Sequence, residues 1–370
     1  MNVIKVPGKL VLLGEYAVLE KNIPAVSCAI NKYIYLLIEE NEKIIFTSKR
    51  IGVSKIELKY NSNKIILEKE NKILNFVKNS IEITLKYLKE NSYKIKFFNI
   101  NILSDLNDNQ GNKYGFGSSS AVCVATVSSI LFLHGYDIKD YKNREIIFKL
   151  SSIAHFISQG SGSGIDIASS VFGGLFIYKS YNQDWLNEKL KKLQNISILV
   201  NDKWEYFYYE KINLLIDFYI SLFWTGYSVN TSHFIEKIKD FKEKDFNKEF
   251  YNKFINSMNK IVESFKYGIR NNKRELINKS IDINRKLLLE LSEKACLDLE
   301  TDKIKKFIRL SNKLGYSAKF SGSGGGDCVF AIVYDKESDK KLKKIMKSLE
   351  LIPIDIEIDF EGVININSFN

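Results

Sequence analysis

The sequence is poor in residues that crosslink or punctuate a chain. Among 370 residues it has 3 prolines, 4 cysteines and 3 histidines. The cysteines, Cys28, Cys123, Cys296 and Cys328, are too widely spaced for a CxxC metal or redox unit and too few for a disulfide scaffold. We therefore expect reduced cysteines in a hydrophobic core.

The sequence also lacks a long apolar run. No stretch reaches the about 18 apolar residues that a membrane helix needs. The beginning, residues 1–8, is polar and motif-bearing, whereas a secretory leader has a basic segment followed by an apolar one. We expect a cytoplasmic protein with no membrane partner.

Negative charge is in short supply, because 44 Asp and Glu face 55 Lys and Arg, which gives a formal net charge of +11. Such an excess suits a nucleic-acid binder, a membrane-surface protein or an enzyme for anionic substrates, since a positive field concentrates anions. The lysines are spread through stretches such as 237–248 and 271–286, and no compact basic arm with interleaved aromatics occurs. We expect solvated helix faces and no nucleic-acid partner.

Hydrophobic periodicity predicts alternating groups of strands and helices. In the first half we expect strands over 33–38, 44–47, 54–60, 95–103 and 173–178, and helices over 72–89, 119–133, 146–157 and 182–192. In the second half we expect strands over 215–224, 328–334 and near 354–358, and helices around 234–238, 254–267, 274–292 and 303–314. The stretch 119–133 is small or apolar on nearly every side, which is typical of a helix buried against a sheet.

The length predicts about two domains. We place their boundary near residue 190, where the pattern turns polar, so the expected domains are 1–190 and 191–370. Each mixes antiparallel strands with helices, and the fold class is α+β.

Two glycine clusters of the first half carry candidate chemistry. In the first, PGKLVLLGEY, Lys9 precedes an apolar strand and either holds an anionic group or pairs with a carboxylate, although Pro-Gly before a strand is often a plain turn. The second, residues 114–121 with the sequence YGFGSSSA, runs into the expected buried helix. Its glycines allow close backbone approach and its helix start favours phosphate, but it is neither a Walker A loop nor a GxGxxG fingerprint, and it also fits an ordinary serine-capped helix start.

One further segment and a third glycine cluster follow. In the segment 155–168, Asp166 comes after a pliable glycine loop and either takes a proton from a hydroxyl or caps a helix. In the third glycine cluster, residues 320–328 with the sequence FSGSGGGDC, four glycines precede an expected strand. They can present consecutive amides to an anion, whereas a flexible linker would not lead straight into a core strand.

Taken in order, PGKLVLLGEY, GFGSSSA, GSGIDIA and SGSGGGD resemble the successive motifs of the galactokinase, homoserine kinase, mevalonate kinase and phosphomevalonate kinase (GHMP) superfamily. The resemblance spans almost the whole chain. It implies a kinase of small molecules that uses ATP and Mg²⁺. It also implies an N-terminal domain like the second domain of ribosomal protein S5, a ferredoxin-like C-terminal domain, and an active site between the two.

Within the superfamily, AHFISQG ahead of GSGIDIASSVFGG, together with SGSGGGDC and residues 224–233, resembles the phosphomevalonate kinase family. Mevalonate kinases usually carry a magnesium-binding glutamate at the position that His155 occupies here. The resemblance therefore leaves the second magnesium ligand unassigned.

The resemblance implies a role for each matched residue. Lys9 and Asp166 are the expected catalytic residues, with Asp166 at the position of the base. The expected ATP-phosphate loop comprises Gly115, Gly117, Ser118, Ser119 and Ser120, with Ser119 also at the magnesium-ligand position. The expected substrate-binding residues are Lys9, Ser163, Ser232, His233, Ser323, Gly324 and Gly325, and Gly322 belongs to the same third motif.

The expected activity is phosphorylation of (R)-5-phosphomevalonate to the diphosphate by a monomer or homodimer. The acceptor is then a phosphate monoester with a second pKa near ~6, mostly dianionic at pH 7. We therefore expect Asp166 to orient Lys9 and the substrate more than to remove a proton. The alternatives are mevalonate kinase, homoserine kinase, the ATP-dependent diphosphomevalonate decarboxylase and a ligand sensor without turnover.

Overall fold

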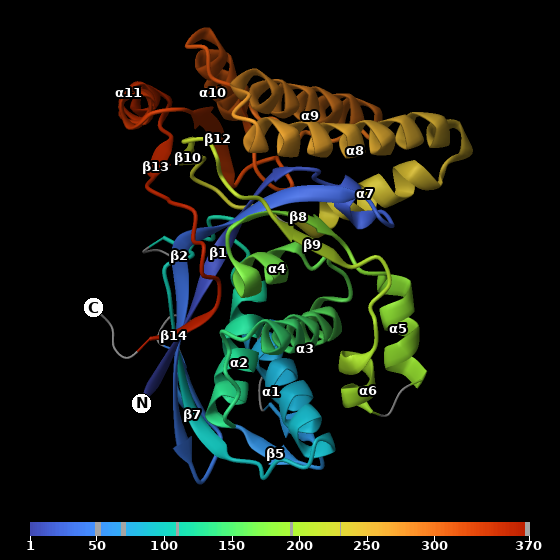
Figure 1. The fold of residues 1–370 in the computed structure, drawn as a ribbon, viewed down its shortest axis with the longest axis vertical. Coiled ribbons are helices and arrows are strands. Elements are labelled where there is room, and N and C mark those ends of the chain that lie inside the picture. Colours follow the sequence, from blue (N-terminus) through green and yellow to red (C-terminus); the bar gives the residue numbers. More distant parts are fainter. Residues whose placement is uncertain (49–52, 68–71, 109–110, 193–194, 230, 367–370) are drawn as a thin grey trace.

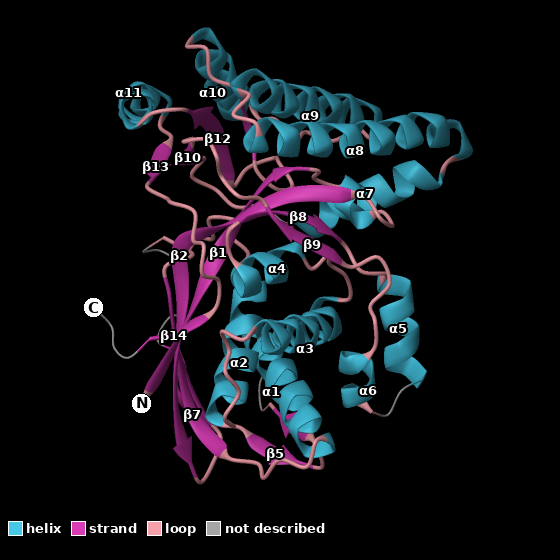
Figure 2. Cartoon of the chain, viewed as in Figure 1, coloured by secondary structure: helices cyan, strands magenta, loops and turns pink. Residues whose placement is uncertain are grey.

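The structure of the protein, a computed structural model, describes residues 1–370 except 49–52, 68–71, 109–110, 193–194, 230 and 367–370. Its lower part in Figure 1 is built mostly by the first half of the chain and its upper part by the second half. Both parts combine a sheet with helices, as the colouring of Figure 2 shows. The α+β class is confirmed.

An eight-stranded sheet frames the first unit. Its strand order is β14-β1-β2-β7-β3-β4, and β8 and β9 extend it from β2. All neighbours are antiparallel except β3 and β7. The strands are β1 (Asn2–Leu13), β2 (Pro24–Asn41), β3 (Ile45–Ser48), β4 (Val53–Glu57), β7 (Phe97–Ser104), β8 (Leu175–Lys179), β9 (Tyr208–Lys211) and β14 (Ile364–Ile366).

Helices cover this sheet. Among them α2 packs on β1 and β2, and α4 on β1, while α1 and α3 pack against α2. The helices of this unit are α1 (Lys72–Glu90), α2 (Ser118–Leu133), α3 (Tyr141–Gln159), α4 (Ile165–Phe172), α5 (Gln183–Lys192) and α6 (Ile196–Asn201). Every residue of α2 from Ser120 to Leu131 is buried, which explains why it is small or apolar on all sides.

The second unit has a four-stranded antiparallel sheet in the order β11-β12-β10-β13. Helices α9 and α10 contact β11, α11 contacts β10, and α8 reaches β1 and β2 of the first sheet. The strands are β10 (Tyr219–Trp224), β11 (Ala318–Phe320), β12 (Cys328–Val333) and β13 (Ile352–Ile354). The helices are α7 (Thr231–Glu243), α8 (Lys248–Arg270), α9 (Arg274–Lys294), α10 (Asp302–Lys313) and α11 (Lys336–Met346).

The expected elements are present, but several differ in extent. Lys9 was expected just before a strand and instead lies inside β1, and the strand expected over 33–38 is part of the longer β2. The expected strand 54–60 divides into β4 and β5 (Lys59–Asn61), and β5 forms a hairpin with β6 (Lys64–Ile66). The break falls at Leu58, which is buried and donates its N–H to the Ile44 carbonyl. The expected strand near 354–358 ends at Ile354, and Ile358 makes an isolated bridge to Ile30.

The boundary near residue 190 stays a prediction. Helix α6 and strand β9 come after residue 190, yet α6 packs on α1 and α3, and β9 pairs with β8. Strand β14 returns from the end of the chain to β1. Segments from the second half therefore complete the first unit.

The cysteine expectation needs one correction. Cys28, Cys123 and Cys328 are free and buried, as expected, but Cys296 is exposed. It follows the end of α9 with a φ of 51°. It therefore belongs to a surface turn, outside the core.

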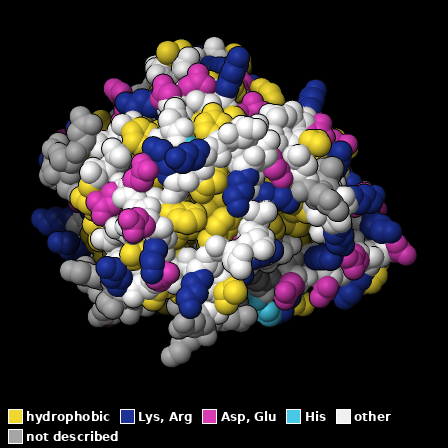
Figure 3. All heavy atoms as spheres, turned by 90° about the horizontal axis from the view of Figure 1, so that it is seen from below, with side chains coloured by type: hydrophobic (Ala, Val, Ile, Leu, Met, Phe, Trp, Pro, Cys, Tyr) yellow, Lys and Arg dark blue, Asp and Glu magenta, His cyan; other side chains and the backbone are white. Residues whose placement is uncertain are grey.

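Charged side chains are dispersed over the face in Figure 3, where Lys and Arg alternate with Asp and Glu around a central group of hydrophobic side chains. This face has the mixed character of solvated elements. Within the described part of the chain, no helix has both the length and the apolar character needed to cross a membrane.

Candidate active site

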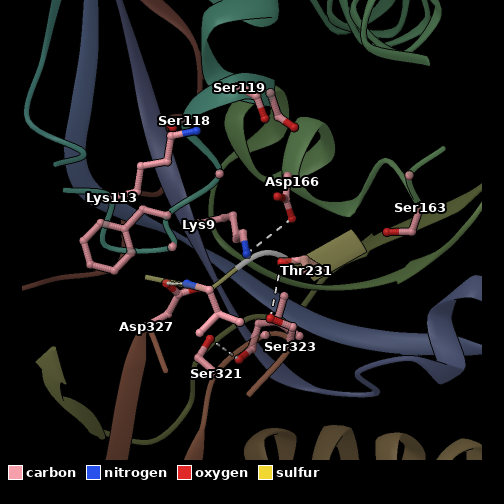
Figure 4. A pocket seen from close by; sticks show the side chains of 18 of the residues that line it. Lys9, Lys113, Ser118, Ser119, Ser163, Asp166, Thr231, Ser321, Ser323 and Asp327 are labelled. Carbon is pink, nitrogen blue, oxygen red and sulfur yellow. Dashed lines mark hydrogen bonds and ion pairs between the residues drawn. The ribbon is translucent and has the colours of Figure 1, made fainter. Parts of the chain in front are cut away.

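A cavity of about 720 Å³ lies where the two units meet. Its wall is formed by the middle of β1, the phosphate loop (residues 115–120), the end of α3, the start of α4 and the third glycine cluster. Figure 4 shows that side chains from these distant segments point toward one another. The motifs singled out in the sequence therefore meet at one place.

Lys9 and Asp166 face each other in this cavity. The Lys9 Nζ lies 3.5 Å from the Asp166 Oδ1, and the two side chains are 10% and 32% exposed. Lys9 follows a bulge in β1 between Pro7 and Gly8, and its N–H donates to the Phe116 carbonyl at 3.1 Å. Asp166 lies in the first turn of α4. The strand and the helix thus hold a cation and an anion at ion-pair distance.

Two observations explain why the phosphate loop has glycine at position 117. Gly117 caps α2 with a φ of 75°, in the left-handed region that suits glycine. A Cβ at Gly117 would also lie 3.1 Å from the Asp166 Oδ2 and 3.2 Å from the Lys9 Cγ. The backbone of the loop therefore packs on the ion pair and leaves little room for a side chain at position 117. The amides that begin α2 have no intrahelical acceptors, which makes this end of the helix suitable for phosphate.

His155 lies beside the expected magnesium ligand. The Ser119 Oγ is 3.4 Å from the His155 Nε2, and the imidazole stacks on Phe76 with 5.2 Å between ring centroids. Burial lowers the pKa of His155 to about 4, and the nearby Asp166 opposes this only in part. The position that carries a glutamate in mevalonate kinases is therefore a neutral imidazole here.

The donor set fits a magnesium ion that is held mainly by phosphate. Mg²⁺ keeps several waters and binds through one or two protein oxygens together with substrate phosphates. The Ser119 hydroxyl, at the start of α2 in the cavity wall, is an oxygen of this kind. In the described ranges, no cluster of three or more His, Cys, Asp and Glu side chains is placed to hold a metal by itself.

The structure distributes the remaining expected substrate residues unevenly. Ser163 and Ser323 line the cavity, and the Ser323 Oγ is 3.3 Å from the Thr231 Oγ1. Gly324 and Gly325 do not line it, because a Cβ there would meet Leu299 and Phe234, respectively.

His233 is exposed on α7 and also lies outside the lining residues. The backbone of Ser232 belongs to α7, but its side chain lies outside the described part of the chain. The substrate-binding roles of His233, Ser232, Gly324 and Gly325 stay predictions.

Three charged residues of the cavity, Glu15, Lys113 and Asp327, were given no site role by sequence reasoning. Glu15 follows Gly14 in the first glycine cluster. Lys113 lines the cavity just ahead of the phosphate loop, and Asp327 lines it at the end of the third glycine cluster. Burial raises the pKa of Asp327 to about 6, with the Val229 N–H, Lys9 and Lys113 opposing the shift. A charged residue within or next to a glycine cluster was the available signal in each case.

The fold and the cavity are of the kind expected in a phosphotransferase. A glycine loop begins a helix, and a lysine lies at ion-pair distance from an aspartate. Two family models match the chain, GHMP kinases N terminal domain over residues 75–174 and GHMP kinases C terminal over residues 265–349. The chain belongs to the GHMP kinase family. Members of this family are ATP-dependent kinases, and the curated relatives described next are kinases of the mevalonate pathway.

The curated relatives include both a phosphomevalonate kinase and mevalonate kinases. The chain is 22% identical to the phosphomevalonate kinase of Streptomyces sp. (strain CL190), over 96% of this chain and 97% of that one. It is 26% identical to the mevalonate kinase of Thermococcus gammatolerans, over 90% and 89%.

Among solved structures, Streptococcus pneumoniae phosphomevalonate kinase in complex with phosphomevalonate and AMPPNP matches with a TM-score of 0.82. This match has 25% identity over 97% of this chain and 100% of that one. Methanococcus jannaschii mevalonate kinase matches with a TM-score of 0.68 and 22% identity, over 96% and 98%.

Proposed function

We propose that the chain is a phosphomevalonate kinase, which transfers the γ-phosphoryl group of ATP to the phosphate of (R)-5-phosphomevalonate with Mg²⁺ as cofactor. The observation that carries the proposal is the meeting of Lys9, Asp166 and the phosphate loop in one cavity. Lys113 adds a second cation there, which suits two anionic ligands. The likeness to the S. pneumoniae enzyme bound to phosphomevalonate supports the acceptor.

In this proposal the residues of the chain act by position and charge. The phosphate loop holds the ATP phosphates, and an oxygen of the acceptor phosphate attacks the γ-phosphorus. The bond from the γ-phosphorus to the bridging oxygen then breaks, and ADP leaves with that oxygen. Lys9 neutralises the negative charge that spreads over the transferred group, and Asp166 orients Lys9.

Ser119 is the residue that would hold Mg²⁺, with the remaining sites left to phosphate oxygens and water. Bound Mg²⁺ supplies charge neutralisation on the phosphates. The His155 imidazole limits rotation of the Ser119 hydroxyl through their 3.4 Å contact. Because burial keeps it neutral, His155 adds no charge of its own to this site.

A mevalonate kinase is the second candidate, since the T. gammatolerans enzyme is 26% identical to the chain. His155 argues against a mevalonate kinase, because mevalonate kinases usually carry a magnesium-binding glutamate at that position. A neutral ring beside Ser119 leaves one negative charge fewer near the phosphates. An acceptor that brings an additional phosphate is better tolerated in such a site.

The test is ADP release by the purified protein with ATP and Mg²⁺, with (R)-5-phosphomevalonate, mevalonate and homoserine as separate acceptors. Product mass and CO₂ release are measured in the same reactions. We expect turnover of phosphomevalonate to the diphosphate without CO₂. Turnover of mevalonate alone would replace the substrate, CO₂ release would indicate a decarboxylase, and no turnover with any acceptor would indicate a ligand sensor.

A further inference from the structure

Asp327 follows the last glycine of the third glycine cluster, and no role given above uses it. Its φ is 50°, in the left-handed region that residues other than glycine seldom adopt. Its N–H donates to the Tyr227 carbonyl at 3.0 Å, and its carbonyl accepts from the Thr225 N–H at 2.9 Å and from the Thr225 hydroxyl at 2.9 Å. The backbone of Asp327 is thereby fixed to residues 225–229, which we call the acceptor-side segment.

The carboxylate of Asp327 reaches in two directions. Its Oδ1 accepts from the Val229 N–H at 3.3 Å, which is a second link to the acceptor-side segment. Its Oδ2 lies 2.8 Å from the place where a Cβ on Gly115 would stand, so it packs directly on the phosphate loop. One side chain of the second unit therefore contacts the phosphate loop of the first.

The surroundings of this carboxylate are mixed in charge. Lys9 of β1 and Lys113 ahead of α2 face it with positive charge. The Cys328 thiol of β12 also faces it, and burial raises the pKa of that thiol well above its ordinary value. The Tyr227 ring of the acceptor-side segment packs on the neighbouring Gly326.

The negative charge of the Asp327 carboxylate should weaken the binding of phosphate groups at the neighbouring loop. Burial raises the pKa of Asp327 to about 6, and the two lysines oppose the shift. In the free protein the carboxylate is therefore mostly ionised at pH 8 and about half protonated at pH 6. Phosphate groups bound at Gly115 bring more negative charge to the carboxylate, which favours its neutral form.

We propose that Asp327 is a positioning residue of this kinase, which ties the phosphate loop to the acceptor-side segment and places a carboxylate whose negative charge opposes phosphate binding beside that loop. The proposal rests on the kinase function proposed above. It assigns Asp327 no contact with the transferred group. Its part is to keep two loops from different units in register.

Two variants separate the hydrogen bond donated by the Val229 N–H from the negative charge of the Asp327 carboxylate. Asp327→Asn retains the shape and an oxygen that can accept from the Val229 N–H, but it has no charge. Asp327→Ala removes both the acceptor and the charge. Asp335→Asn is the matched control, because Asp335 is an aspartate that caps α11 and does not line the cavity.

The first measurement is the Kd of AMPPNP with Mg²⁺ between pH 5.5 and 8, which does not depend on turnover. For the wild type and for the control, Kd should rise with pH more than for Asp327→Asn, by about tenfold if binding raises the carboxylate pKa by one unit. Titration of the nucleotide is common to all three proteins, so their difference isolates Asp327. A merely structural role would lower the melting temperature without changing this pH profile.

The second measurement is KM for the acceptor that the wild type turns over. Asp327→Ala should raise it about tenfold, the size expected for one lost hydrogen bond to a charged group, whereas Asp327→Asn should stay within about threefold. Identical pH profiles of Kd for wild type and Asp327→Asn, or an unchanged acceptor KM in Asp327→Ala, would overturn the proposal. If no acceptor is turned over, the proposed function fails, and the pH dependence of Kd still decides the role of the Asp327 carboxylate.

Discussion

At the scale of single residues, Lys9 supplies buried positive charge where the transferred group is expected. It is only 10% exposed, so solvent screens it weakly. Because the transition state spreads negative charge over the transferred group, Lys9→Met should lower kcat by about a thousandfold, the loss typical of a preorganised charge stabiliser. Asp166→Asn should cost about tenfold, below the ~100-fold that a general base contributes, because the phosphate of the proposed acceptor is already ionised. Steady-state kinetics with phosphomevalonate measures both.

The control for this pair is Lys21→Met, which removes an exposed lysine that pairs with Asp184 at 3.9 Å on the surface. It should leave kcat unchanged. A larger loss in Asp166→Asn than in Lys9→Met would contradict the assignment and make Asp166 the general base.

His155 should make stability depend on pH. Burial lowers its folded pKa to about 4, below the ordinary 6.5. Between these values the unfolded chain binds a proton that the folded chain does not, so the folded state loses stability as pH falls from 6.5 to 4. The full effect is about 3 kcal/mol at 1.36 kcal/mol per pKa unit. In His155→Gln this part of the slope should vanish, as urea unfolding at pH 7, 5.5 and 4.5 would show. Equal slopes in both proteins would refute the shift.

At the scale of elements, a buried ion pair at the wall of the cavity joins the turn that follows β1 to β11 and α9. Lys319 Nζ pairs with the Glu15 carboxylate, and the two side chains are 0% and 3% exposed. Asn284 of α9 donates to Glu15 at 3.2 Å and accepts from the Gly14 N–H at 2.9 Å. The strand that carries Lys9 is thus fastened to the second unit by charge as well as by packing.

Removing one partner of this pair should cost more than removing both. Lys319→Met leaves the Glu15 charge buried without its cation, a loss of about 3–5 kcal/mol. Glu15→Gln combined with Lys319→Met removes both charges and should recover most of the loss. Urea unfolding of the two single variants and the double variant measures this, and simple addition of the single costs would show that the charges are not coupled.

The elements show what sequence periodicity can and cannot predict. Helix α2 and strand β12 were predicted because long apolar patterns and glycine boundaries are local signals. The hairpin of β5 and β6 was missed because its strands are too short for a period. The contact of Asp327 with Gly115 was missed because it joins segments that are far apart in the sequence, and no local rule registers such a pairing. The meeting of Lys9 and Asp166 was anticipated only through the family resemblance.

At the scale of the whole molecule, the end of the chain returns to the first unit. Strand β14 pairs with Val3–Lys5 of β1, and the Asp359 carbonyl accepts from the Gly174 N–H at 2.6 Å. The Val363 N–H donates to the Val171 carbonyl of α4 at 3.3 Å. The returning segment therefore touches both elements that carry the ion pair, β1 with Lys9 and α4 with Asp166. Two domains were predicted from length, but this return of the chain end to β1 and α4, which we call the closure, was not.

Gly362 tests the closure because it lies where the returning segment meets α4. A Cβ there would stand 2.4 Å from the Val171 carbonyl oxygen, and its φ is 73°. Gly315→Ala is the control, with a φ of 84° and no atom within 4 Å of its Cβ. The control should cost about 1 kcal/mol of backbone strain, and Gly362→Ala about 3 kcal/mol or more because the backbone must also move.

The backbone shift in Gly362→Ala should also lower the reaction rate. If the returning segment holds α4 in place, Gly362→Ala should lower kcat by about tenfold to a hundredfold at temperatures where the protein stays folded, since small misplacements of reacting groups are costly. Gly315→Ala should keep kcat, because no atom lies within 4 Å of its Cβ and the substitution therefore displaces nothing. Melting curves and kcat for the two variants separate the outcomes. Loss of stability in Gly362→Ala with full kcat would mean that the closure stabilises the fold without positioning Asp166.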